Sequence, residues 1–212
     1  MNGIIADLVF SFVSSDEEEH RGYYSALTTG YFDEIATAFE GKEHSFSLMT
    51  KLGDDAEAVA ARSYYSAQYD YDAVYFTSTL YPTAISVEGE TRLRYSALSD
   101  ITESDVVSYI DEKNIDTLFV SASLLSFKPV SREIVKGIVK RKDTLKRVVV
   151  DTTLDYDILL LEELKDSIEA LRDSGVAVSV VGEALSIDGV RGMSILKRDE
   201  ILSGLTEQEG QE

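Results

Sequence analysis

The feature that most constrains the fold is the regular alternation of short apolar runs with amphipathic segments in the second half of the chain. The strand-length apolar runs are 117–121, 147–151 and 176–181, and the segments with helical apolar spacing between them are 131–140 and 161–172. A further helix, through Ile110, is expected after Thr102, because Thr102 and Asp105 have the spacing of a capping box. Strands and helices that alternate at this interval form right-handed βαβ units. The sequence therefore predicts an α/β fold built on a parallel sheet.

The first half of the chain contains two kinds of strand pattern. Residues 3–13 are almost continuously apolar, which is typical of a strand covered on both faces, as in a parallel sheet. Residues 83–87 and 91–95 instead alternate between apolar and polar side chains around the turn at 88–90, and they predict a β-hairpin. Together with the run at 73–78, they predict a smaller antiparallel layer set apart from the main sheet.

Two glycine turns frame residues 29–55. Gly30 opens the first turn, and Gly53 opens the second, which carries Asp54 and Asp55. The elements expected around these turns are helices over 33–39 and 56–69 and a strand over 45–49. Open α/β sheets bind ligands at strand ends and helix N-termini, so the stretch is a candidate binding site. A structural explanation also exists, because an aspartate before a helix caps its N-terminus.

Composition excludes several classes of function. The 212 residues contain no cysteine, which excludes disulfides, thiolate metal sites and cysteine nucleophiles. The net charge of -19 argues against nucleic acid, whose binding needs a basic surface, and against an anionic membrane. No apolar run approaches the roughly 20 residues that span a bilayer, and the N-terminus lacks the basic start of a signal peptide. We expect an acidic, soluble, cytoplasmic protein.

Taken in order, these elements resemble the ribokinase-like (PfkB) carbohydrate kinases. Gly30 stands where that family has the second glycine of a Gly-Gly turn, and Gly53 follows it 23 residues later, at the start of a Gly-Asp-Asp turn, as expected for the family. The other matching positions are Pro82-Thr83 and Glu88-Gly89-Glu90 with Arg92, which resemble the lid strand and its Gly-Glu-Arg-like turn; Asp151, at the Asp-Pro-Asn-like segment; and Val180-Val181-Gly182-Glu183, at the Asn-x-x-Glu region.

The resemblance covers most of the chain but only the front part of the family pattern. It implies an α/β fold with a ribokinase-like three-layer sheet, truncated, and a small antiparallel β lid. The expected organisation is one domain over 1–203, with lid elements at about 14–29 and 80–98, and an acidic disordered tail over 204–212.

The resemblance also gives four candidate substrate-binding residues, which are Asp7, Ser11, Gly30 and Glu34. Asp7 fits the first polar ligand position on the first strand, whereas Ser11 replaces the second acid of the family pattern. Thr29 replaces the first glycine of the turn, and Glu34 replaces the sugar-binding asparagine. Because a carboxylate lacks the two N–H donors of an amide, the hydrogen bonds to sugar hydroxyls would have to be rebuilt.

The catalytic Gly-Ala-Gly-Asp segment of the family is not found in the 212 residues. In the family, that segment supplies a helix N-terminus for phosphoryl charge and the aspartate that acts as general base. Asp151-Thr152-Thr153 does not replace it, because Leu154-Asp155 follows rather than glycines. We expect a protein that is catalytically inactive alone, with no catalytic residue, metal site or required cofactor, and that acts by binding a ligand or a partner.

Two alternatives stay open. The chain could belong to an active sugar kinase whose C-terminal half is missing here or is supplied by another chain, and that kinase would use ATP and Mg. It could also be a structural dimerisation module in which lid strands, near Arg94 and Tyr95, pair between subunits. The expected partners are therefore a sugar or nucleoside and a second copy of the chain, with no nucleic acid and no membrane.

Overall fold

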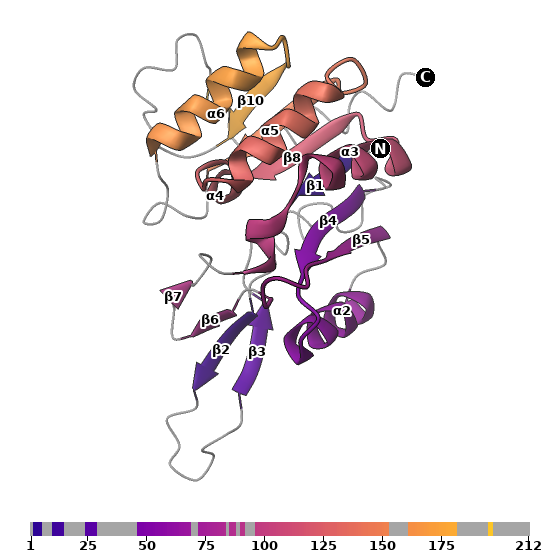
Figure 1. Ribbon diagram of the computed structural model, residues 1–212, viewed down its shortest axis with the longest axis vertical. Helices are drawn as coiled ribbons and strands as arrows, with labels where there is room; N and C mark the ends of the chain where they lie inside the picture. Colours follow the sequence, from indigo (N-terminus) through magenta and orange to yellow (C-terminus); the bar gives the residue numbers. More distant parts are fainter. Residues whose placement is uncertain are drawn as a thin grey trace.

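The computed structural model describes residues 2–5, 10–14, 24–28, 46–68, 72–83, 85–87, 90–91, 96–152, 161–181 and 195–196. The described strands form a seven-stranded sheet and a four-stranded sheet (Figure 1). In spatial order, the larger sheet contains β11 (Ile195–Leu196), β10 (Val178–Val181), β9 (Arg147–Asp151), β8 (Thr117–Ser121), β1 (Asn2–Ile5), β4 (Phe46–Leu52) and β5 (Asp72–Thr77). Each neighbouring pair in it is parallel, which confirms the predicted parallel sheet.

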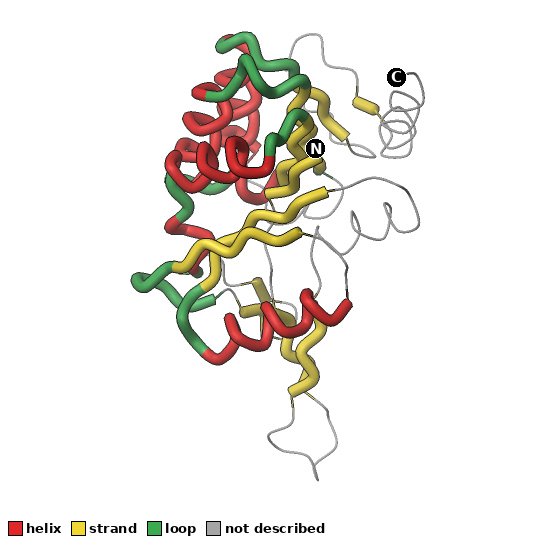
Figure 2. The backbone as a smooth tube through the Cα atoms, turned by 90° about the vertical axis from the view of Figure 1, so that its right-hand side faces the viewer, coloured by secondary structure: helices red, strands yellow, loops and turns green. Residues whose placement is uncertain are grey.

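The helices of the second half lie together on one side of this sheet, whereas α2 lies apart from them (Figure 2). The described helices are α2 (Ala56–Gln68), the 3-10 helix η3 (Ala97–Asp100), α3 (Glu103–Lys113), α4 (Ala122–Leu125), α5 (Val130–Lys140) and α6 (Leu161–Asp173). Helix α3 begins as predicted, because the Thr102 hydroxyl accepts from the Asp105 N–H while the Asp105 carboxylate accepts from the Thr102 N–H.

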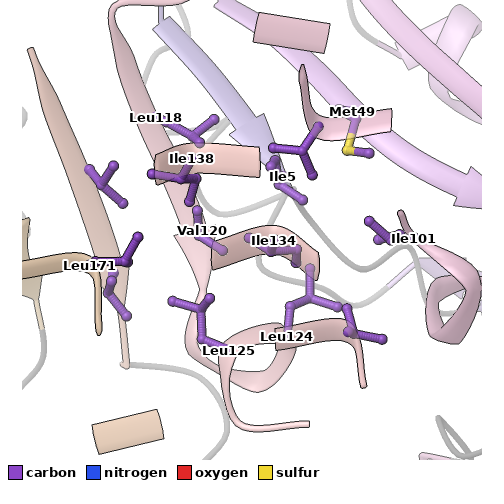
Figure 3. Packing of buried hydrophobic residues seen from close by; sticks show 14 of the residues in the cluster. Ile5, Met49, Ile101, Leu118, Val120, Leu124, Leu125, Ile134, Ile138 and Leu171 are labelled. Carbon is purple, nitrogen blue, oxygen red and sulfur yellow. The ribbon is translucent and has the colours of Figure 1, made fainter. Parts of the chain in front are cut away.

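The main hydrophobic core lies between the large sheet and α3, α4, α5 and α6. Ile5, Met49 and Val120 from the sheet and Ile134 and Ile138 from α5 all belong to it (Figure 3). Strands β1 and β8 are buried along their whole described length. This burial on both faces explains why the apolar residues of these strands, Ile4-Ile5 and Leu118-Phe119-Val120, follow one another rather than alternate with polar ones.

Tyr109 of α3 places its hydroxyl between two parallel strands of the core. The hydroxyl accepts a hydrogen bond from the Ile4 N–H at 3.0 Å and donates one to the Ser47 carbonyl at 2.5 Å. Tyr109 is fully buried, so no water can replace these bonds.

We expect Tyr109→Phe to lower the free energy of unfolding by about 2 kcal/mol, since it removes the two buried hydrogen bonds that the hydroxyl makes to Ile4 and Ser47. Urea unfolding of both variants would measure the loss. Tyr81→Phe is the matched control, because Tyr81 is 36% exposed and its substitution should change stability by less than about 0.5 kcal/mol. Equal losses of unfolding free energy in Tyr109→Phe and Tyr81→Phe would show that the buried Tyr109 hydroxyl contributes no more than a partly exposed one.

The four-stranded sheet combines strands from two distant segments. Its spatial order is β3 (Tyr24–Thr28), β2 (Phe10–Ser14), β6 (Ile85–Val87) and β7 (Glu90–Thr91). The β6–β7 hairpin is confirmed, with Val87 opposite Glu90. The expectation of a purely antiparallel layer is wrong, because β2 and β6 are parallel. The run at 73–78 was also misplaced by the sequence pattern, since β5 is a strand of the large sheet, parallel to β4.

The predicted single strand over 3–13 is also corrected. Its first part is β1, in the large sheet, and its last part is β2, in the small sheet. The run is longer than an ordinary strand of five or six residues. Apolar composition alone does not show where such a run leaves one sheet and enters another, because both of its parts form strands.

Candidate functional site

The carboxyl edge of the large sheet is the candidate functional site. Because its strands are parallel, their carboxyl ends meet at this one edge. From β1 the chain first builds the sheet toward β4 and β5, and later continues on the other side of β1 with β8, β9 and β10. The order therefore reverses between β1 and β8, and open α/β sheets bind ligands outside the carboxyl ends at such a point.

The small sheet is connected to this same edge. The chain passes from the carboxyl end of β1 into β2, and from the carboxyl end of β5 toward β6. Figure 1 shows β2 and β3 beyond the carboxyl end of β4. The site edge and the small sheet are therefore neighbours by topology.

The turn after β4, at Gly53–Asp55, is held from two directions. The Asp55 carboxylate accepts from the Ala58 N–H at 2.9 Å, which caps α2 and confirms the structural explanation given for this residue. Its other oxygen accepts from the Thr83 N–H at 2.6 Å, and the Thr83 hydroxyl accepts from the Gly53 N–H at 3.0 Å. The turn is thus fastened to the segment that leads into the small sheet.

Lys51, just before this turn, is a site residue that the sequence reasoning missed. Only 7% of its side chain is exposed, and its Nζ donates to the Asp100 carbonyl at 2.6 Å and to Asp105 Oδ2 at 2.9 Å. Asp100 Oδ2 accepts in turn from the Ser78 hydroxyl at 2.9 Å. The available signal was a lysine two residues after the predicted strand 45–49 and directly before Leu52-Gly53, because a lysine that is buried there needs a partner.

Buried hydroxyl groups and a carboxylate lie at the carboxyl ends of β8 and β9, at the same edge. The Ser121 and Ser123 hydroxyls share a hydrogen bond. Ser121 lies opposite Asp151 across the β8–β9 ladder, and both residues are buried. Thr152 bonds to the Val181 carbonyl through its N–H and its hydroxyl, both at 2.8 Å. Hydroxyls and carboxylates in this arrangement can donate to and accept from polyol hydroxyls.

The four predicted substrate-binding residues are only partly placed. Asp7, Gly30 and Glu34 lie outside the described residues. Ser11 lies in β2, opposite Leu27 of β3, and so belongs to the small sheet rather than to the first strand of the large sheet.

A cavity of about 180 Å³ lies between α5 and α6, and Glu163 is one of its lining residues. Burial alone would raise the pKa of Glu163, but hydrogen bonds from Lys128 and Ser131 lower it below its usual range. The Lys128 ammonium pairs with one Glu163 oxygen, and the Ser131 hydroxyl donates to the other at 2.7 Å. Through these bonds, Glu163 of α6 is attached to Ser131 of α5 and to Lys128, which lies just before α5.

Two negative findings apply to the described residues alone. No group of three or more histidine, aspartate or glutamate side chains there is placed to hold a metal ion. None of the helices described is both long enough and apolar enough to cross a membrane.

Comparison with solved structures identifies the fold. A PfkB protein from Polaromonas sp. JS666 superposes with a TM-score of 0.66 at 14% identity, over 85% of this chain and 64% of that chain. The fold is that of the PfkB carbohydrate kinases. An uncharacterized sugar kinase from Pyrococcus horikoshii gives a TM-score of 0.63 at 16% identity, over 85% of this chain and 65% of that one.

A fructokinase from Vibrio cholerae O395, solved with fructose, ADP and calcium ion, gives a TM-score of 0.66 at 15% identity. The superposition covers 97% of this chain and 67% of that fructokinase. The chain therefore spans about two thirds of the length of each of these three structures. No protein-family model matches the sequence, and neither does any curated protein sequence.

Proposed function

We propose that this PfkB-like chain binds a sugar or nucleoside at the carboxyl edge of its large sheet and does not transfer phosphate by itself. The observation that carries the proposal is the topology of the edge. The point where strand order reverses, between β1 and β8, lies at the edge from which the chain enters the small sheet.

The proposed binding chemistry is hydrogen bonding to sugar hydroxyls. Asp7 follows the carboxyl end of β1 by two residues and would act as a charged acceptor. Ser11, Gly30 and Glu34 stay candidates for the same surface. The small sheet would act as a lid over the ligand, which would keep water from these hydrogen bonds.

The proposed lack of phosphoryl transfer rests on two features. Such transfer depends on positioning and charge stabilisation, and the 212 residues contain no Gly-Ala-Gly-Asp segment to supply them. Asp151-Thr152-Thr153 does not replace that segment, because Leu154-Asp155 follows rather than glycines, and the Thr152 hydroxyl is bonded to the Val181 carbonyl. We therefore propose no cofactor for the 212 residues alone.

We expect a saturating sugar or nucleoside to raise the melting temperature by about 5–10 °C without ATP, since a ligand at 100 times its Kd stabilises the native state by about 2.7 kcal/mol. Differential scanning fluorimetry of sugars, nucleosides and ATP, each alone, would measure the shift, and calorimetry would give the Kd. Asp7→Asn should weaken binding about tenfold, because an interaction with a charged acceptor is lost. Asp143→Asn, at an exposed residue, is the matched control and should bind normally. The absence of any shift across the sugar and nucleoside panel would contradict the proposal.

This chain covers about two thirds of the matched solved structures. That coverage favours one alternative, in which a further segment completes an active sugar kinase that uses ATP and Mg. Steady ATP turnover by the 212-residue chain with any sugar would overturn the proposed lack of activity. Turnover only after a second polypeptide is added would support the alternative.

A structural role is a second alternative, because β3 and β7 end the order of the small sheet and unpaired edges can bind another copy. Light scattering would test this role by showing whether the particle has the mass of a monomer or of a dimer. The nearby Arg94 and Tyr95 lie outside the described residues.

A further inference from the structure

Two described segments connect the large sheet to β6 and β7 of the small sheet and back, and both are joined to the end of β4. The outgoing segment, 78–83, follows β5, and the returning segment, 96–100, contains η3. The Ala97 N–H donates to the Pro82 carbonyl at 2.7 Å, so the two segments also bond directly to each other. The small sheet strands β6 and β7 lie between them in the chain.

Lys51 provides the cationic group in this region. It lies in β4 and donates to the returning segment at Asp100 and to the first turn of α3 at Asp105. Asp100 then accepts from Ser78 of the outgoing segment, and the Ser78 hydroxyl accepts from the Leu80 and Tyr81 N–H groups, each at 3.2 Å. A continuous chain of hydrogen bonds thus runs from β4 through both segments.

The second attachment is the turn after β4. Thr83 bonds to Gly53 and to Asp55 there, at 3.0 and 2.6 Å. A backbone hydrogen bond strengthens this attachment: the Ser78 N–H donates to the Leu52 carbonyl at 2.8 Å. The outgoing segment is therefore held at its beginning and at its end.

We propose that this network holds the small sheet in one orientation relative to the large sheet, with Lys51 as its organising residue. We call it the polar clamp, and its members are Lys51, Gly53, Asp55, Ser78, Thr83, Asp100 and Asp105. An ammonium group with three donors suits this position, since it lies beside two carboxylates, those of Asp100 and Asp105, and also bonds a backbone carbonyl. The proposal goes beyond ligand binding and needs no ligand for its test.

The clamp also gives the candidate site a link to the small sheet. Asp55 belongs to the clamp and to the turn at the carboxyl edge. A group bound at that turn would compete for the Asp55 oxygen that Thr83 uses, and would thereby change how the outgoing segment is held.

Orientation can be measured directly, because the chain has no native cysteine to interfere with labelling. Spin labels on Glu90→Cys in β7 and Asp173→Cys in α6 would report, by double electron–electron resonance, the distance between the small sheet and a helix that packs on the large sheet. The unaltered clamp should give one narrow distance distribution. Lys51→Met and Ser78→Ala should each at least double its width, whereas Lys146→Met, which removes an exposed ion pair with Asp116, should leave it unchanged.

Hydrogen exchange separates a clamp from a general loss of stability. In Ser78→Ala, which removes only one hydroxyl, the amides of Thr83 and Ala97 should exchange at least tenfold faster. The amides of β8 should stay within twofold of the parent. Equal acceleration in β8 would assign Ser78 a purely structural role and overturn the proposal. An unchanged distance distribution in both Ser78→Ala and folded Lys51→Met would overturn it as well.

Discussion

Replacing Lys51 by methionine is expected to lower the free energy of unfolding by about 3 kcal/mol. The variant keeps most of the apolar stem but leaves the Asp100 and Asp105 carboxylates without their cation. Those side chains are only 26% and 15% exposed, so water replaces the lost ammonium poorly. Removing one partner of a buried ion pair is costly because the charge that stays behind is unpaired.

Urea unfolding followed by circular dichroism would measure this loss. Lys146→Met is the matched control, because the Lys146 side chain is 78% exposed and its pair with Asp116 should contribute less than about 1 kcal/mol. Adding Asp105→Asn to Lys51→Met should recover part of the stability, since one unpaired charge is removed. A loss of unfolding free energy as small as that of Lys146→Met would show that the Lys51 ammonium does not stabilise the fold.

Replacing Gly53 by alanine is expected to lower the free energy of unfolding by about 2 kcal/mol. A Cβ at Gly53 would lie 2.8 Å from the Thr83 nitrogen and 3.0 Å from the Pro82 carbonyl carbon. Both atoms belong to backbone, which cannot rotate aside as a side chain can. The turn and the outgoing segment would have to separate, and the Gly53–Thr83 hydrogen bond would weaken.

Thermal and urea unfolding would measure the effect, with Gly175→Ala as a contrasting variant. A Cβ at Gly175 meets nothing within 4 Å, but its φ of +86° disfavours alanine. Gly175→Ala should therefore lower the free energy of unfolding by about 1 kcal/mol, through the backbone conformation alone. Gly53→Ala should also accelerate amide exchange at Thr83, whereas Gly175→Ala should not. Unchanged exchange at Thr83 in Gly53→Ala would contradict the close approach.

Much of the large sheet could be predicted from the sequence because its elements are defined locally. The strands at 117–121 and 147–151 were found with the bounds that the structure has, and α3 begins at the predicted Thr102 cap. Apolar period, helix spacing and capping residues all act within a few neighbours along the chain. The order of the glycine turns and strands further indicated the PfkB-like fold, which the structural comparisons bear out.

Sequence patterns could not show which distant segments pair. The run at 3–13 has the composition of one strand, yet it contributes to two sheets, and β5 resembled a strand of the small layer. Of the four candidate substrate residues, only Ser11 lies among the described residues, and the other three stay predictions.

The sequence by itself determined the α/β class, the parallel sheet and the helix that Asp55 caps, because each follows from local periodicity and capping. Only the tertiary structure decided that Lys51 is buried against Asp100 and Asp105, and that Thr83 bonds to the turn at Gly53. These partners are separated by 30 to 54 positions along the chain. Hydrogen bonds between such distant groups form only once the sheets have assembled, so no short sequence pattern specifies them.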